Sequence, residues 1–354
     1  MNNKELIFLC GARDFHAMDW YRSAQEVLPK EKLSIVTDLI AGEGFNKIIN
    51  EEDNLTKLLI LDNFLFKGQS KLGNLWRNIL KFIVLPYQVF LLKNHSKKKP
   101  NAIFYAHSMY YLWLAHYAKV NYIGTPQGSD ILIKPFKSNI FRILSVKALK
   151  SAKFVTVDSE KMKEKMIEMS GVIPYIIQNG IDMKSIEGFI NKTKKVKRNK
   201  VVSIRGFTPL YRIKEIANSR NAIKNLKDYP LTFIYPFYSN EYKNEVLQFI
   251  DKEIDNDLGR VNRDKMYKLL YNSKLVVSIP SSDSSPRSVY EAIFCGAVVA
   301  ITYHPYYDFL PDCMRKRVIV IDLNNKNWLF NAYNEAIQIL NSKFAPSEKA
   351  LELF

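Results

Sequence analysis

The stretch that decides the fold is KLVVSIPSSDSSPRSVYEAIFCGAVVAITY, residues 274–303. It opens with an apolar run rich in β-branched residues, 275–279, which is typical of a buried parallel strand. A polar turn follows, and Pro286 then begins a helical pattern that Ser285 is expected to cap. Gly296 ends the helix, as glycine commonly does, and a second apolar run comes directly after it. The pattern predicts a strand–helix–strand unit whose polar loop leads into a helix N-terminus.

This loop has the residue types that a nucleotide-sugar requires. The N–H groups of Ser288 and Val289 are expected to point at an anion, helped by the helix dipole. Asp283 in the loop and Glu291 in the helix lie eight residues apart and can accept hydrogen bonds from sugar hydroxyls. Phosphate at the helix end and carboxylates for hydroxyls together indicate a nucleotide-sugar. The same spacing also allows Asp283 simply to cap a turn and Glu291 to face solvent.

The segment SDSSPRSVYEAIFCGAVV resembles the acid-x7-acid signature of retaining family-4 glycosyltransferases of the GT-B fold. The closest likeness is to a branch that builds bacterial surface polysaccharides, in which the first acid is aspartate. The resemblance implies that Glu291 holds the nucleotide ribose. It also implies that Asp283 contacts the donor sugar as a catalytic residue.

A second segment, RGFTPLYR, follows a predicted strand at 201–204 and resembles the family's R-x4-K region, whose cations bind the donor diphosphate. Arg205 matches the first cation. Leu210 stands where the lysine is expected, and Arg212, two residues later, is the predicted substitute. Arg287, next to the helix start, is expected to contribute, since arginine suits bidentate phosphate contacts.

Further candidates come from the N-terminal half. His16 follows the first predicted strand, and in a doubly wound sheet such positions face the ligand. His16 is therefore a candidate catalytic residue, with Asp19 and Arg22 beside it. The segment QGSD resembles the family's H-G-x-D segment, which makes Asp130 a third catalytic candidate, although Gln127 replaces the histidine. No GxGxxG dinucleotide fingerprint is found.

The fold class predicted is α/β, with two Rossmann-like domains whose parallel sheets face each other across a cleft, as in GT-B. Residues 1–190 form the acceptor-side domain, 191–200 a basic linker, and 201–354 the nucleotide-sugar-binding domain. Besides those already given, strands are expected at 6–10, 33–40, 58–65, 102–105, 122–125, 153–157, 175–178, 231–236 and 318–321. Helices are expected at 17–28, 46–53, 159–169, 241–253, 263–271 and 327–340.

Residues 72–100 are apolar and aromatic in the middle and basic at the end. The apolar core, 82–92, is interrupted by Pro86 and is shorter than the roughly 20 residues of a membrane-spanning helix. One interpretation is a helix lying on a membrane surface, with Trp76 and the basic residues Arg77, Lys81 and Lys97 to Lys99 at the headgroups. The other is a buried crossover helix with a solvated basic end.

The 354-residue chain has a formal net charge of +17, which indicates an anionic partner such as acidic lipid, nucleic acid or a phosphorylated substrate. A general abundance of lysine in the source proteome would also explain the charge. Three scattered cysteines predict no disulfide framework and a reducing compartment, and no signal peptide is evident. No metal-ligand spacing is found, and the D-N-D at 255–257 is expected at a polar helix end, without metal.

The predicted function is transfer of a sugar from a UDP- or GDP-sugar to a lipid-linked or polysaccharide acceptor, with retention. The expected location is the cytoplasm, peripherally on the inner face of the cell membrane, where the anionic surface is a partner. No cofactor beyond the donor and no metal is expected, and nucleic acid is not the expected partner. Three alternatives stay open: a nucleotide-sugar epimerase of the same fold, a glycosyltransferase acting on nucleic acid, and a non-enzymatic basic membrane-surface scaffold.

Overall fold

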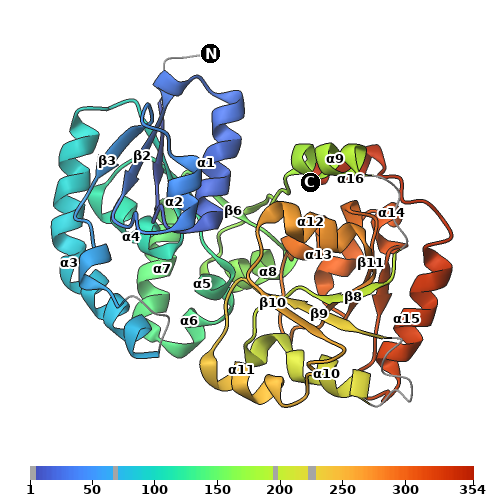
Figure 1. Cartoon of the computed structure of the whole chain (residues 1–354). Coiled ribbons are helices and arrows are strands. Elements are labelled where there is room, and N and C mark those ends of the chain that lie inside the picture. The colour runs from blue at the N-terminus through green and yellow to red at the C-terminus, as the bar shows by residue number, and fades with distance from the viewer. Residues whose placement is uncertain (1–4, 67–70, 194–197, 222–228) are drawn as a thin grey trace. The chain divides into compact units, whose positions relative to one another are not determined.

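The computed structural model describes residues 5–66, 71–193, 198–221 and 229–354 and divides the chain into two compact units, Met1–Ile177 and Gln178–Phe354. Each unit contains one parallel sheet accompanied by helices (Figure 1). The predicted α/β class with two parallel-sheet domains is therefore confirmed.

Unit 1, Met1–Ile177, is built on a seven-stranded sheet in the order β3-β2-β1-β4-β5-β6-β7. Its strands are β1 Leu6–Leu9, β2 Leu33–Thr37, β3 Asn54–Lys57, β4 Ile103–His107, β5 Tyr122–Thr125, β6 Phe154–Val157 and β7 Tyr175–Ile176. Its helices are α1 Phe15–Val27, α2 Glu43–Ile48, α3 Lys71–Lys97, α4 Met109–Ala118, α5 Gly128–Leu132, α6 Lys134–Lys137, α7 Asn139–Ser151 and α8 Glu160–Ser170. The strand order reverses between the neighbours β1 and β4, and ligands of such sheets bind outside the strand ends at that point.

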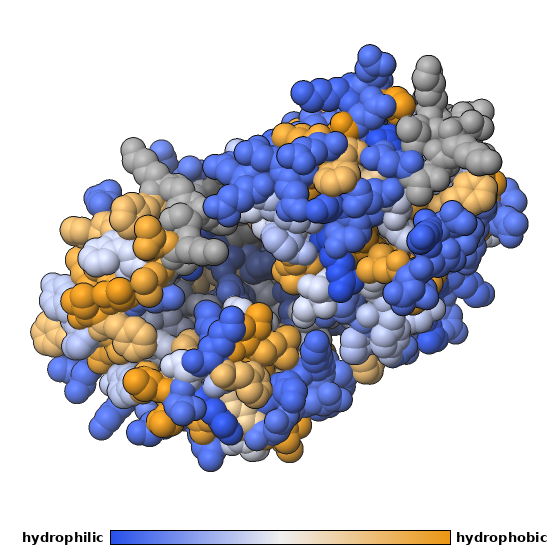
Figure 2. Space-filling view, turned by 90° about the horizontal axis from the view of Figure 1, so that it is seen from below, coloured by the Kyte–Doolittle hydropathy of each residue, from blue (hydrophilic) through white to orange (hydrophobic). Residues whose placement is uncertain are grey.

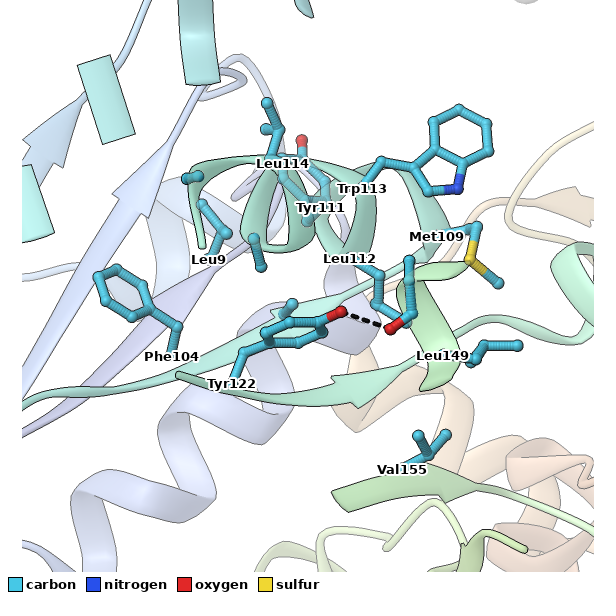
Figure 3. Close-up of a cluster of buried hydrophobic side chains, with 14 of the residues drawn as sticks. Leu9, Phe104, Met109, Tyr111, Leu112, Trp113, Leu114, Tyr122, Leu149 and Val155 are labelled. Carbon is cyan, nitrogen blue, oxygen red and sulfur yellow. Dashed lines mark hydrogen bonds between the residues drawn. The ribbon is translucent and has the colours of Figure 1, made fainter. Parts of the chain in front are cut away.

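The core of unit 1 lies between the sheet and helix α4. Leu9 of β1, Phe104 of β4 and Leu112 of α4 are almost completely buried there, and Figure 3 shows them in one cluster. The hydroxyl of Tyr122 donates a hydrogen bond to the carbonyl of Ala148 in the same cluster. These strands are buried on both faces, which explains why they read as continuous apolar runs.

Unit 2, Gln178–Phe354, is built on a six-stranded sheet in the order β10-β9-β8-β11-β12-β13. Its strands are β8 Lys200–Ser203, β9 Leu231–Ile234, β10 Asn256–Gly259, β11 Ser273–Ser278, β12 Val298–Ile301 and β13 Val318–Val320. Its helices are α9 Met183–Lys192, α10 Ile213–Asn221, α11 Asn240–Leu247, α12 Arg263–Tyr271, α13 Arg287–Phe294, α14 Asp312–Arg315, α15 Trp328–Ile339 and α16 Glu348–Leu353. The order reverses between β8 and β11. The predicted strand–helix–strand unit is β11–α13–β12, and Gly296 ends α13 at φ +80°.

Two edge strands were not predicted correctly. The apolar run 58–65 is not a strand: it forms a short 3₁₀ turn, Asp62–Phe64, and the strand β3 is the polar segment just before it. The D-N-D segment leads into strand β10, which contains Asn256 and Asp257, and does not lie at a helix end. Both strands lie at sheet edges, where one side has no partner strand and an apolar alternation is not required.

The boundary between the units falls before the predicted linker. Helix α9, which precedes that linker, belongs to unit 2 because Ile186 is buried in the core that also contains α12 and α13. Asp182 caps α9 and pairs with Arg263 of α12 at 3.0 Å, which adds to this attachment. Within the predicted linker, residues 194–197 lie outside the described residues.

Helix α3 is the main departure from the sequence prediction. It runs through Pro86 without a break, and its stretch Leu75–Lys97 is long and apolar enough to cross a membrane by length and composition. The prediction that no such stretch exists was therefore wrong. Residues on both sides of Pro86 bind one buried carboxylate: Lys81 lies 3.7 Å from Asp38, and Gln88 donates to it at 3.2 Å. These contacts hold the two halves in line although proline removes one helical hydrogen bond.

Candidate active site

The first candidate site is at the switch point of unit 2, where the loops after β8 and β11 meet. Arg205 follows β8, and its guanidinium donates to the Asp283 carboxylate at 2.5 Å and to the Ser288 hydroxyl at 3.1 Å. The side chains of Arg205 and Asp283 are each 12% exposed. The structure thus brings together three residues that the sequence assigned to the donor site, although they are 78 to 83 residues apart in the chain.

The loop that follows Arg205 contacts both Arg205 and the loop after β11. The Arg205 guanidinium lies over the ring of Tyr211 at 4.7 Å, and its Nε atom is buried with no partner among the described residues. The carbonyl of Leu210 accepts a hydrogen bond from the N–H of Ser281 at 2.8 Å. Arg212 directly follows the 3₁₀ turn Pro209–Tyr211 and has a left-handed backbone at φ 53°.

The N-terminus of α13 differs in detail from the prediction. Pro286 occupies the N-cap position, and the Ser285 hydroxyl lies 3.3 Å from the Tyr290 hydroxyl, so Ser285 does not cap the helix. The N–H of Val289 donates to the carbonyl of Pro286 at 3.0 Å and is not free for an anion as expected. Ser288 lies in the first turn of α13, as predicted, and its hydroxyl accepts the hydrogen bond from Arg205. Arg287 is the half-buried first residue of the helix.

Glu291 is 7% exposed in the second turn of α13, which excludes the alternative in which it faces solvent. Its charge acts on Tyr267 and Cys295, whose pKa values are raised first by burial and then by Glu291. Asp283 accepts a hydrogen bond from the N–H of Ser284 at 3.1 Å in addition to the one from Arg205. Burying a carboxylate such as that of Glu291 costs free energy, so a polar partner for it is expected inside this site.

A cavity of about 690 Å³ lies in unit 1 at the β1/β4 switch point. Its lining comes from the loops after these two strands, from the start of α4 and from α3, α6 and α7. Asp14 caps α1 by accepting the His16 N–H at 3.0 Å and also accepts a hydrogen bond from the Gln127 amide. Gln127, which replaces the family's histidine, therefore joins the two loops.

The catalytic candidates of unit 1 have different outcomes. His16 is exposed in the first turn of α1 and is not among the residues lining the cavity. Asp19, in the same helix, is buried and lies 3.8 Å from Arg22. Asp130 lines the cavity, but its carboxylate accepts three hydrogen bonds. The donors are the N–H groups of Met109 (2.9 Å) and Gln127 (3.1 Å) and the Lys134 ammonium (2.7 Å). These contacts make Asp130 a positioning residue for the surrounding loops.

His107, which the sequence reasoning missed, ends β4 and lines this cavity. It is 4% exposed, and neither ring nitrogen has a partner among the described residues. Burial lowers the pKa of His107 below its usual value, so the ring is neutral at pH 7. The next residue, Ser108, has φ 73° and ψ 152°, a region otherwise reserved for glycine, and such strain concentrates at functional sites. The available signal was a histidine two residues after the predicted strand 102–105, but the sequence does not reveal that this strand lies beside β1.

Both carboxylates of the D-N-D segment bind side chains of the protein. Asp255 receives both terminal nitrogens of Arg220 at 2.5 Å, with both side chains completely buried, and Asp257 accepts a hydrogen bond from Tyr235 at 2.7 Å. Among the described residues, no group of three or more His, Cys, Asp or Glu side chains is arranged to hold a metal ion.

No family model matches the chain, and no curated protein matches it. Among solved structures, sucrose-phosphate synthase from Thermosynechococcus elongatus superposes with a TM-score of 0.67 at 11% identity, over 99% of this chain and 97% of that one. The chain has the GT-B fold. A glycosyltransferase from Rickettsia africae gives a TM-score of 0.66 at 14% identity, over 96% and 90%. A putative UDP-N-acetylglucosamine 2-epimerase from Listeria monocytogenes gives 0.58 at 14% identity, over 97% and 89%. Proteins of the same fold but different activity thus resemble this chain. Its activity therefore has to be inferred from the residues at its sites.

Proposed function

We propose that this protein is a glycosyltransferase that moves a sugar from a UDP- or GDP-sugar to a membrane-associated polysaccharide or lipid-linked acceptor, with retention. The observation that carries the proposal is the contact set of Arg205, Asp283 and Ser288 at the unit 2 switch point, with Glu291 buried in the same helix. Membership of the family-4 surface-polysaccharide branch rests on the acid-x7-acid motif.

In the proposed reaction, an acceptor hydroxyl forms a bond to the anomeric carbon while the bond from that carbon to the diphosphate oxygen breaks. The electron pair leaves with the diphosphate, which takes the acceptor's proton. Arg205, Arg212 and the α13 N-terminus stabilise the charge on the leaving group, and preorganised donors of this kind are commonly the largest catalytic term. Asp283, released from Arg205 by the diphosphate, then accepts hydrogen bonds from the sugar.

The choice of nucleotide has separate support. MnaA of S. aureus, solved with UDP, superposes on this chain with a TM-score of 0.55 at 13% identity. TarM of S. aureus, solved with UDP and α-GlcNAc-glycerol, superposes on 72% of it with a TM-score of 0.54. UDP is therefore our first choice of nucleotide, ahead of GDP.

The membrane part of the proposal rests on α3. One face packs on α4 through Leu85, Val89 and Leu92, and the opposite face carries exposed apolar side chains, among them Ile83 at 66% and Phe90 at 56%. Hydrophobic residues gather over unit 1 at the left of Figure 2. A helix that packs on α4 along one face suits a membrane surface better than a membrane crossing.

The basic residues assigned to headgroups need revision. Arg77 and Lys81 line the cavity, and Lys99 is paired with Glu5. Lys97 and Lys98 remain exposed near the end of α3. In the proposed contact with a membrane surface, the apolar face of α3 therefore contributes more than the sequence indicated, and the basic residues contribute less.

A nucleotide-sugar epimerase is the second candidate because an epimerase is among the superposed structures. Incubation with UDP-sugars and GDP-sugars, followed by product analysis, separates the two functions. A glycosyltransferase releases free nucleoside diphosphate in proportion to glycosylated acceptor. An isomerised nucleotide-sugar without released diphosphate would contradict the proposal and establish the epimerase.

A further inference from the structure

The cavity of unit 1 is basic. Five lysine and arginine side chains line it, against two carboxylates. Two of the five cations are neutralised inside the protein: Lys134 lies 2.7 Å from Asp130, and Lys81 lies 3.7 Å from the buried Asp38.

Arg13 and Arg77 have no such pairing. No acidic side chain within the described part of the chain forms an ion pair with either one. Both arginines line the cavity, and the pKa of Arg77 is lowered first by burial and then by the charge of Arg13. Asp14, which also lines the cavity, already accepts hydrogen bonds from the backbone N–H of His16 and from the Gln127 amide. Two arginines that line one cavity without an ion pair among the described residues suit an anion with several oxygens.

Two buried side chains lining the same cavity also lack a hydrogen-bond partner among the described residues. His107 and Trp113 are each 4% exposed, and the ring nitrogens of both are unsatisfied. An indole N–H only donates, and a neutral imidazole donates from one nitrogen. Buried polar groups are normally satisfied, so these donors indicate a ligand that supplies acceptor atoms.

The remaining wall is aromatic and apolar. The ring of Trp113 lies 5.7 Å from that of Phe82 and 5.0 Å from that of Phe141, and in Figure 3 its indole points away from Leu9 and Phe104. Phe82 and Ile140 line the cavity and are 48% and 67% exposed. The wall is thus continuous with the exposed apolar faces of α3 and α7.

We propose that the unit 1 cavity binds a phosphate ester, with Arg13 and Arg77 on the phosphate oxygens and the aromatic wall along the rest of the molecule. The volume of about 690 Å³ is that of an ordinary small-molecule site. The identity of this phosphate ester as the sugar acceptor rests on the proposed function. The phosphate is carried either by a lipid or by a soluble sugar.

Calorimetric titration of the full chain with farnesyl diphosphate, glucose 6-phosphate and farnesol tests the proposal. At least one phosphorylated compound should bind, and farnesol should bind much more weakly. Arg13→Gln and Arg77→Gln should each weaken binding about tenfold or more, since each removes a charge-assisted hydrogen bond. Tighter binding of farnesyl diphosphate assigns the phosphate to a lipid, and tighter binding of glucose 6-phosphate assigns it to a soluble sugar.

Matched variants locate the binding. Arg142→Gln, at an exposed position of α7 outside the cavity, should bind as the wild type does. Arg77→Lys should keep part of the affinity, and Trp113→Phe should remove most of the ligand-induced change in tryptophan fluorescence. Arg205→Gln should leave the affinity for the phosphorylated compound unchanged while it weakens UDP binding.

The proposal is wrong if neither phosphorylated compound binds, or if Arg13→Gln and Arg77→Gln, shown to be folded by circular dichroism, bind as tightly as the wild type. It is equally wrong if Arg205→Gln abolishes the binding and Arg77→Gln does not, because the phosphate then lies in unit 2. Binding that depends on Arg77 in a protein that binds no nucleotide would support this site and contradict the proposed function.

Discussion

Replacing Arg205 by glutamine should separate nucleoside diphosphate from nucleoside binding. Arg205 donates hydrogen bonds to Asp283 and to Ser288 in the first turn of α13, so a diphosphate at that helix end would contact it. Loss of one charge-assisted hydrogen bond costs about 1.5–3 kcal/mol, which is roughly a 10- to 150-fold increase in Kd for UDP. The affinity for uridine should not change, because uridine has no phosphate.

The same substitution should also lower the free energy of unfolding. Asp283 loses its partner at a site where both side chains are 12% exposed, and an unsatisfied partly buried group costs about 1–3 kcal/mol. Isothermal titration with UDP and uridine, and urea unfolding, measure the two effects, with Arg315→Gln as an exposed control in the same unit. Equal losses of affinity for UDP and uridine would show that Arg205 is only structural, and unchanged UDP affinity would refute its assignment to the donor site.

Other predictions concern stability and location. Arg220→Ala should cost about 3–5 kcal/mol in urea unfolding because it leaves a completely buried aspartate unpaired, whereas Arg315→Ala breaks an exposed pair and should be nearly neutral. Since burial lowers the pKa of His107 below 6.5, the unfolded chain binds the proton more readily, and stability should fall as the pH drops below about 6.5. His107→Gln should remove up to about 1.4 kcal/mol per pH unit of that slope, and an unchanged slope would contradict the pKa argument. Ile83→Glu on α3 should reduce co-sedimentation with anionic liposomes, whereas Ile337→Glu, at an exposed position of unit 2, should not; equal behaviour would exclude α3 as the contact.

The sequence predicted the fold well where the strands are central. Runs such as 275–279 and 122–125 are buried on both faces, and their continuous apolar character is a local signal. The edge strands β3 and β10 have no such signal because half of their surroundings is solvent. The run 58–65 was misread because Leu58 and Leu61 are buried by packing and not by strand pairing.

The residues proposed for the donor site could be chosen from the sequence because they lie in two short segments with a recognisable spacing. The contact between Arg205 and Asp283 depends on β8 and β11 being neighbours, which no local pattern reveals. His107 was missed for a similar reason: its position matters only because β4 lies beside β1. The continuity of α3 through Pro86 depends on Asp38, which is distant in sequence, so the local rule for proline gave the wrong answer.

Thermal unfolding with UDP, GDP, ADP and CMP, on the wild type and on Glu291→Ala, tests the central claim most directly. UDP or GDP at 100 times its Kd should add about 2.7 kcal/mol to the stability of the wild type. Glu291→Ala should need a roughly 10- to 150-fold higher nucleotide concentration for the same effect, because it removes a charge-assisted hydrogen bond to the ribose. Failure of every nucleotide to stabilise the wild type, or equal affinity in the two proteins, would contradict the account of the donor site.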